Sequence, residues 1–184
     1  MLDRLIDDVN KALDAGAYFA ALTLALTIPD ICAKAEYGDT FRNNKKRYVE
    51  WFKTYIGEYE ICPGQDGEDR MPYLSGEVVY SLRNNMLHQG TPNINKDKII
   101  DDANKIDEFS LVIEGKNEFD IYSDFASLTK ECFGEQIKST RTYDVNVQRL
   151  CLIICLAAKK MYEANKDKFS FFNFRIIDRD KEKQ

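Results

Sequence analysis

Residues 143–165, YDVNVQRLCLIICLAAKKMYEAN, contain the clearest helical pattern in the chain. Apolar side chains recur there at helical spacing and form one stripe, which consists of Val147, Leu150, Cys151, Ile154, Cys155, Ala158 and Met161. A stripe of this kind is typical of a helix that packs one face against a core. The stretch therefore predicts a long amphipathic helix in a helical protein.

The N-terminal part of the chain predicts two further helices. Residues 2–14 place apolar side chains on one face and acidic side chains opposite. Residues 18–35 are apolar almost all round, which indicates a central buried helix. Pro29 lies inside this segment, and we expect it to kink the helix near Thr27 or to restart it, because proline lacks an N–H and clashes with the preceding turn.

Two more helices are expected in the middle of the chain, at residues 40–57 and at residues 73–89. Gly90 and Pro92 follow the second of these and are a strong helix stop signal. Most of the chain is thus predicted to be helical.

One β-hairpin is predicted after these helices. Residues 109–114 and 118–122 alternate apolar and polar side chains around Gly115-Lys116-Asn117. We therefore expect a single all-α domain over residues 1–184, with a small hairpin insertion at about 106–123 and a flexible tail at about 178–184.

Composition limits the classes of function. The chain has 184 residues, a formal net charge of −5, 44% hydrophobic and 31% charged side chains, so we expect a globular protein without a global basic field for nucleic acid. Five cysteines form no Cys-x-x-Cys pair, no signal-like segment opens the chain, and no apolar run reaches the roughly 18–20 residues of a membrane span. Reduced thiols in a cytoplasmic protein are the simplest interpretation.

The only histidine of the chain, His88, closes the predicted helix at residues 73–89. The string Arg83-Asn84-Asn85-Met86-Leu87-His88 places Asn84 and His88 four positions apart, on one helix face. Arg83 and His88, five apart, point about 140° from each other. They converge only if the arginine stem folds across, if the last helical turn loosens, or if a second copy supplies the complement.

These three side chains suit phosphodiester cleavage without a metal. Arg83 supplies a planar cation that matches phosphate geometry and stabilises charge in a transition state. His88 can accept a proton from a ribose 2′-hydroxyl or donate one to the leaving oxygen. Asn84 can orient the imidazole or a phosphate oxygen.

The string from Arg83 to His88 resembles the signature of the HEPN superfamily, in which an arginine, a polar residue and a histidine lie near the end of a helix. The resemblance implies an antiparallel helical bundle and a metal-independent endoribonuclease that acts on RNA. It also implies a homodimer in which two motifs form a composite site. Many relatives are toxins or phage-defence effectors, with a nucleotidyltransferase-type antitoxin as partner. Others are non-catalytic modules that bind nucleotides, RNA or proteins, which is the alternative function.

Other residues are weaker candidates. A basic cluster of Arg42, Lys45 and Lys46 is a candidate for RNA backbone binding, although a solvated helix face explains it more simply. Gln89 is a further candidate for substrate contact, with helix-end solvation as its simpler role. Asp30 can support the Arg83 guanidinium, but its position directly after a proline favours a first-turn role.

The remaining motifs point to no cofactor. Cys151 and Cys155 lie four apart on the apolar stripe and are expected to be buried core thiols rather than metal ligands. The sequence contains no glycine-rich nucleotide loop and no Gly-x-Ser-x-Gly hydrolase elbow. A third interpretation is a structural domain whose aromatic segment, residues 171–177, contacts a partner.

Overall fold

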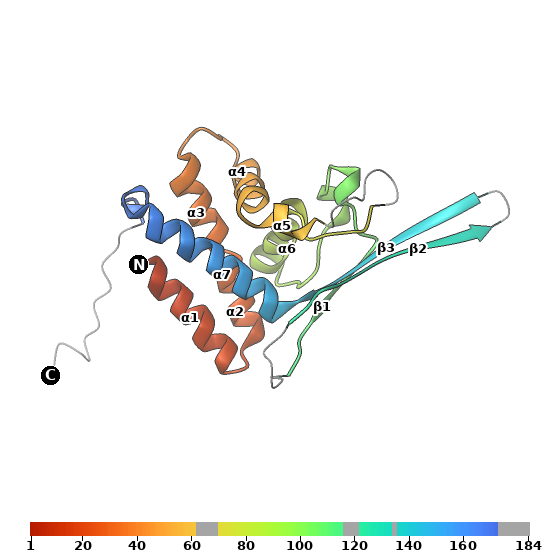
Figure 1. Cartoon of the computed structure of the whole chain (residues 1–184), viewed down its shortest axis with the longest axis horizontal. Coiled ribbons are helices and arrows are strands. Elements are labelled where there is room, and N and C mark those ends of the chain that lie inside the picture. The colour runs from red at the N-terminus through yellow and green to blue at the C-terminus, as the bar shows by residue number, and fades with distance from the viewer. Residues whose placement is uncertain (62–69, 116–121, 134–135, 173–184) are drawn as a thin grey trace.

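The fold is a helical body from which a long two-stranded arm extends (Figure 1). The computed structural model describes residues 1–61, 70–115, 122–133 and 136–172. Its main helices are α1 Leu2–Asp14, α2 Tyr18–Ala25, α3 Ile28–Tyr37, α4 Asn44–Phe52, α5 Glu58–Glu60, α6 Gly76–Gln89 and α7 Val147–Ala164. Its strands are β1 Glu108–Val112, β2 Phe125–Phe133 and β3 Gln136–Asn146. Short 3₁₀ segments are Lys96–Lys98, Asp102–Asn104 and Lys166–Phe169.

The N-terminal helices follow the sequence pattern closely. α1 covers the whole predicted range of 2–14. The apolar segment after it restarts rather than kinks, since α2 ends at Ala25 and α3 begins at Ile28. Pro29 thus lies in the first turn of α3, where its missing N–H costs no helical hydrogen bond.

The middle helices are shorter than predicted because side-chain caps determine where they begin. Asn43 accepts a hydrogen bond from the backbone of Lys45 at 2.8 Å and starts α4, which continues into a π-helical turn, Lys53–Gly57. Ser75 accepts one from the backbone of Val78 at 3.3 Å and starts α6.

The expectation of an all-α fold is wrong. The structure is mixed α/β and contains a three-stranded sheet in the order β1-β3-β2. β2 and β3 pair antiparallel, from Phe125 opposite Asp144 to Phe133 opposite Gln136. This long hairpin forms the protruding arm, which the sequence pattern did not predict.

The predicted hairpin at about 106–123 is also wrong in its pairing. Its first half forms β1, which pairs in parallel with β3, from Glu108 opposite Thr142 to Val112 opposite Asn146. The second half lies mostly in residues 116–121, outside the described residues, and Tyr122 belongs to no strand. The tail at 178–184 and most of the aromatic segment 171–177 also lie outside the described residues.

The core is centred on α7. All seven residues of its predicted stripe are buried, including Cys151 and Cys155. α7 begins at Val147, later than predicted, because residues 143–146 belong to β3. Asn146 starts the helix by accepting a hydrogen bond from the backbone of Arg149 at 3.0 Å. The helix packs on α1, α2 and α3, and Met161 accepts a hydrogen bond from the Trp51 indole at 3.2 Å.

One described segment, Tyr18–Tyr37, is long and apolar enough to cross a membrane by length and composition alone. It comprises α2 and α3, whose inner side chains, such as Leu22 and Cys32, are fully buried. Burial in the core accounts for its apolar character.

Candidate functional site

The last two turns of α6 carry Arg83, Asn84 and His88, and Gly90 ends the helix. Gly90 adopts a left-handed conformation with φ 66°, which a residue with a side chain adopts with strain. The N–H groups of Gly90 and Thr91 donate to the carbonyls of Met86 and Asn85, each at 3.2 Å. This cap fixes the end of the helix and leaves His88 exposed on its last turn.

One chain brings Arg83 and His88 together. The Nη1 atom of Arg83 lies 3.2 Å from Nε2 of His88, and it also donates to Oδ1 of Asn84 at 2.9 Å. The arginine stem folds across the helix surface, which was one of the routes to convergence that the sequence left open. The separation of about 140° that helical geometry alone gives is therefore overcome within one chain.

The contact defines the role of the imidazole. A guanidinium carries donors only, so Nε2 of His88 is the acceptor in this hydrogen bond. Nε2 is also the atom that would abstract a proton in base catalysis, and Arg83 covers it.

Asp30 on α3 holds Arg83 in place. Its Oδ2 accepts hydrogen bonds from Nε of Arg83 at 3.0 Å and forms an ion pair with Nη2 at 2.9 Å. Asp30 lies in the first turn of α3, as the sequence indicated, and it also supports the guanidinium, the role that the sequence ranked second. We name Asp30, Arg83, Asn84 and His88 the Arg83 cluster.

Burial shapes the electrostatics of this cluster. Desolvation raises the pKa of Asp30 above its ordinary value, although the charges of Arg83 and Arg47 oppose the shift. Beneath it, burial raises the pKa of Tyr48 far above its usual range, and the charge of Asp30 adds to that effect. The carboxylate is thus held in a partly apolar setting, where its interaction with Arg83 is poorly screened.

A pocket of about 330 Å³ opens beside the cluster. Asn84 lines it together with Tyr80, Ser81 and Glu77 of α6, Lys45 of α4 and residues of the segment that follows α6. Tyr80 also lies under the Arg83 guanidinium, 5.9 Å from the ring centre. Sequence reasoning missed Tyr80, although its place three residues before Arg83 puts the two on neighbouring positions of one helix.

The other predicted substrate residues are placed less favourably. Lys45 lines the pocket, but its ammonium already contacts Glu77 at 3.5 Å and donates to the carbonyl of Lys98 at 2.9 Å. Arg42 and Lys46 are exposed, and among the described residues no hydrogen bond or ion pair joins either of them to the Arg83 cluster. Gln89 is exposed next to His88. Of the predicted basic cluster, only Lys45 therefore lies at this site.

Within the described ranges, no group of three or more His, Cys, Asp or Glu side chains could hold a metal ion. Burial raises the pKa of Cys155 to about 12, so this thiol stays protonated in the core.

Compared with known proteins, the chain matches no protein-family model, no curated protein and no solved structure.

Proposed function

We propose that this protein is a metal-independent endoribonuclease whose active site is the Arg83 cluster. The observation that supports this proposal best is the contact between the exposed imidazole of His88 and the Arg83 guanidinium, which Asp30 anchors. A proton-transferring group thus lies beside a fixed cation. Cleavage of an RNA phosphodiester without a metal can use this combination.

In the proposed reaction, the ribose 2′-oxygen attacks the phosphorus atom while Nε2 of His88 takes the hydroxyl proton. The bond from phosphorus to the 5′-oxygen breaks, and that oxygen leaves with a proton. The products are a 2′,3′-cyclic phosphate and a 5′-hydroxyl, so atoms and charges balance without a co-reactant. Arg83 stabilises the negative charge that develops on the phosphate oxygens.

Substrate binding is proposed to expose the base. In the free protein, Nη1 of Arg83 donates to Nε2 of His88. A phosphate oxygen is a stronger acceptor and competes for this donor. When the guanidinium turns toward phosphate, the lone pair of Nε2 becomes available to the 2′-hydroxyl. The pocket beside Asn84 and Tyr80 then offers space for the adjoining nucleoside.

The reaction has two proton transfers, whereas one chain carries one histidine. We therefore propose that a homodimer supplies the second imidazole as general acid. RNA is the proposed substrate in the cytoplasm. A toxin or phage-defence role with a nucleotidyltransferase-type antitoxin belongs to the same proposal and is supported only by the sequence resemblance.

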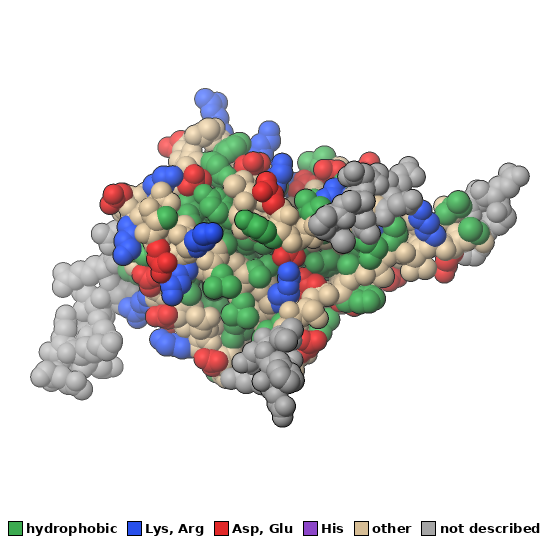
Figure 2. Space-filling view, viewed as in Figure 1, with side chains coloured by type: hydrophobic (Ala, Val, Ile, Leu, Met, Phe, Trp, Pro, Cys, Tyr) green, Lys and Arg blue, Asp and Glu red, His purple; other side chains and the backbone are tan. Residues whose placement is uncertain are grey.

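A non-catalytic RNA- or nucleotide-binding module is the second candidate. One observation favours it: Arg83 covers Nε2 of His88. Cationic and acidic side chains are interspersed over the face shown in Figure 2. A phosphate held by Arg83 without proton transfer would fit this arrangement equally well.

The test is cleavage of total RNA in excess chelator. Wild type should cleave and leave cyclic phosphate ends. His88→Ala should lower the rate roughly 100- to 10,000-fold, as expected for a lost general base. Arg83→Lys should lower it roughly 100-fold, because lysine keeps the charge but loses the planar fork. Arg4→Ala, an exposed arginine on α1, is the matched control and should cleave like wild type.

Equal cleavage by wild type and His88→Ala would refute the mechanism. RNA binding without cleavage by wild type would favour the binding module. For the homodimer, an excess of His88→Ala chains should inhibit wild type by forming mixed dimers. Unchanged wild-type activity in this mixture would refute the shared site.

A further inference from the structure

The pocket of about 330 Å³ beside the Arg83 cluster has walls that suit a nucleobase. Tyr80 contributes a half-buried aromatic ring, and Ile100 contributes an apolar side chain that is 78% exposed. Aromatic and apolar walls favour a flat ring. Asn84 joins this pocket to the Arg83 cluster, because its Oδ1 accepts from Nη1 of Arg83 at 2.9 Å. A base in the pocket would therefore lie next to a phosphate at Arg83.

The charges of the lining favour a neutral group over a phosphate. The lining holds two carboxylates, Glu77 and Asp97, and two amines, Lys45 and Lys98. The Glu77 carboxylate is already engaged, because it pairs with Lys45 at 3.5 Å and accepts a backbone hydrogen bond at 3.1 Å. A pocket with balanced charge suits a base, whereas the phosphate is better held by the guanidinium of Arg83.

Asp97 is the group in the lining that can distinguish one base from another. It lies exposed in the 3₁₀ segment Lys96–Lys98, and its backbone N–H donates to Asn95 at 3.1 Å. Among the described residues, no hydrogen bond or ion pair engages its carboxylate. Two carboxylate oxygens match two adjacent N–H donors. On the Watson–Crick edge guanine has such a pair, N1–H and N2–H, whereas adenine, cytosine and uracil place an acceptor next to their donor.

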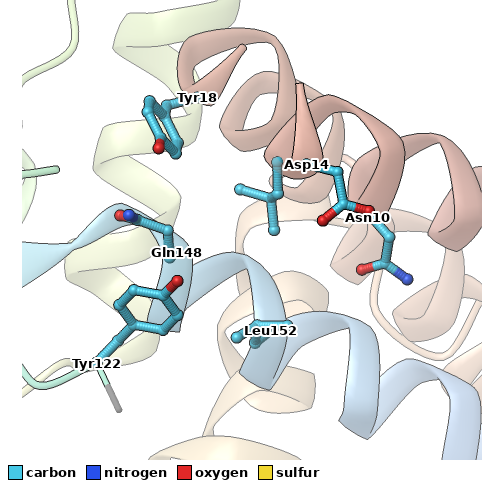
Figure 3. Close-up of a pocket in the computed structure, with 7 residues that line it drawn as sticks. Asn10, Asp14, Tyr18, Tyr122, Gln148 and Leu152 are labelled. Carbon is cyan, nitrogen blue, oxygen red and sulfur yellow. The ribbon is translucent and has the colours of Figure 1, made fainter. Parts of the chain in front are cut away.

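A ligand can reach the Asp97 carboxylate directly, which distinguishes this pocket from a larger one between the end of α1 and α7. That pocket measures about 390 Å³ and is lined by Gln148 among others (Figure 3). The Oε1 atom of Gln148 has no partner among the described residues, but it is buried. The pocket beside Asn84 presents an accessible acceptor instead.

We propose that the pocket beside Asn84 binds the guanine base of a guanosine that adjoins the scissile phosphate. The Asp97 carboxylate accepts from N1–H and N2–H of the base. Nδ2 of Asn84, whose Oδ1 is held by Arg83, donates to O6. This proposal deepens the proposed cleavage and rests on it for the place of the phosphate at Arg83. It makes guanosine-containing RNA the substrate and Asp97 the residue that determines specificity.

Cleavage of an oligoadenylate that contains a single guanosine tests the base preference. Bonds that adjoin the guanosine should be cleaved about 100-fold faster than the others, since two hydrogen bonds to a charged acceptor are gained. Inosine lacks the 2-amino donor and should lose about tenfold of this preference. 7-Deazaguanosine keeps both donors and should behave like guanosine. Equal cleavage beside guanosine and adenosine, or beside guanosine and inosine, would overturn the proposal.

Titration calorimetry tests the same site without requiring cleavage. Guanosine 3′-monophosphate should bind about 100-fold more tightly than adenosine 3′-monophosphate. If RNA is not cleaved but this preference is found, the cleavage proposal fails and the guanine site stands. If RNA is cleaved and neither assay shows a preference for guanine, the guanine site fails and the cleavage proposal stands.

Variants test the residues that line the pocket. Asp97→Asn should bind both nucleotides with the affinity that wild type has for the adenosine nucleotide, because asparagine offers one acceptor and no charge. Ile100→Ala should weaken both nucleotides alike, by about threefold, because it removes part of an apolar wall. Asp7→Asn, an exposed residue of α1, is the matched control and should keep the preference for guanosine. A full preference for guanosine in Asp97→Asn would refute the role of Asp97.

Discussion

Asp30 is a residue whose charge is better explained by positioning Arg83 than by stabilising the fold. It bonds Arg83 through one oxygen at 3.0 and 2.9 Å, yet burial still raises its pKa. The free energy needed to desolvate the Asp30 carboxylate therefore exceeds its attraction to the Arg83 guanidinium. Such an ion pair is weak evidence for stability, and we interpret Asp30 as a residue that positions Arg83.

Asp30→Asn should separate stability from activity. The ordinary pKa of the carboxyl is 3.8 and the folded value is higher, so the folded state binds more protons between the two values. Stability then falls as pH rises through this window, and the cost of the charge is fully present above it. The free energy of unfolding of the variant should be no lower than that of wild type at neutral pH, because asparagine removes the charge whose desolvation outweighs its attraction to Arg83.

This difference should shrink as pH falls toward 3.8, which urea titrations at several pH values measure. RNA cleavage should fall at neutral pH, because Arg83 loses its charged anchor. Asp30→Glu should restore part of the rate. A variant that loses several kcal/mol at neutral pH, or that cleaves like wild type, would contradict the positioning role.

At the scale of elements, the close approach of α4 and α6 depends on a glycine. Gly76 is buried at the start of α6, and a Cβ there would lie 2.7 Å from the backbone oxygen of Val49 on α4. The backbone atom cannot turn away as a flexible side chain would. Because Gly76 has no side chain, α6 can pack closely against α4, and in this position Arg83 of α6 reaches Asp30 of α3.

Gly76→Ala should push the two helices apart and lower the free energy of unfolding by about 1–3 kcal/mol. Urea denaturation measures the change. Gly115→Ala is the control, because a Cβ there meets no atom within 4 Å, and its stability should stay near that of wild type. Equal stability of wild type and Gly76→Ala would show that α4 shifts at little cost.

At the scale of the whole molecule, one buried ionic network joins the sheet to the helices. Arg149 of α7 donates to Asp124 at 2.7 Å and to both oxygens of Glu60 at 2.8 and 3.0 Å. Tyr143 of β3 donates to the same Asp124 carboxylate at 3.0 Å. Burial alone would lower the pKa of Arg149, but the hydrogen bond to Glu60 and the charges of both carboxylates raise it.

Arg149→Met should leave two buried carboxylates without their cation. We expect a loss of about 3–5 kcal/mol in the free energy of unfolding, measured by urea denaturation. Lys160→Met, on the exposed side of the same helix, should change it by less than about 0.5 kcal/mol. If Arg149→Met were as stable as the control, water would have to solvate Glu60 and Asp124, which contradicts their burial.

The sequence alone determined much of the helical framework. Apolar periodicity located α1 and most of α7, Pro29 located the break between α2 and α3, and Gly90 located the end of α6. Helical spacing also placed Asn84 and His88 on one face, but it pointed Arg83 about 140° away from His88. These patterns involve residues about four positions apart, so they predict helices without knowledge of the rest of the fold.

The tertiary structure decided everything that joins distant segments. Parallel pairing of β1 with β3 links residues that lie 34 positions apart, such as Glu108 and Thr142. The sequence of neither strand indicates which strand it pairs with. Asp30 reaches Arg83 across 53 positions. The pocket at Gln148 combines α1, α2, α7 and Tyr122. Such contacts depend on how buried faces pack together, and local sequence patterns carry no information about which faces meet.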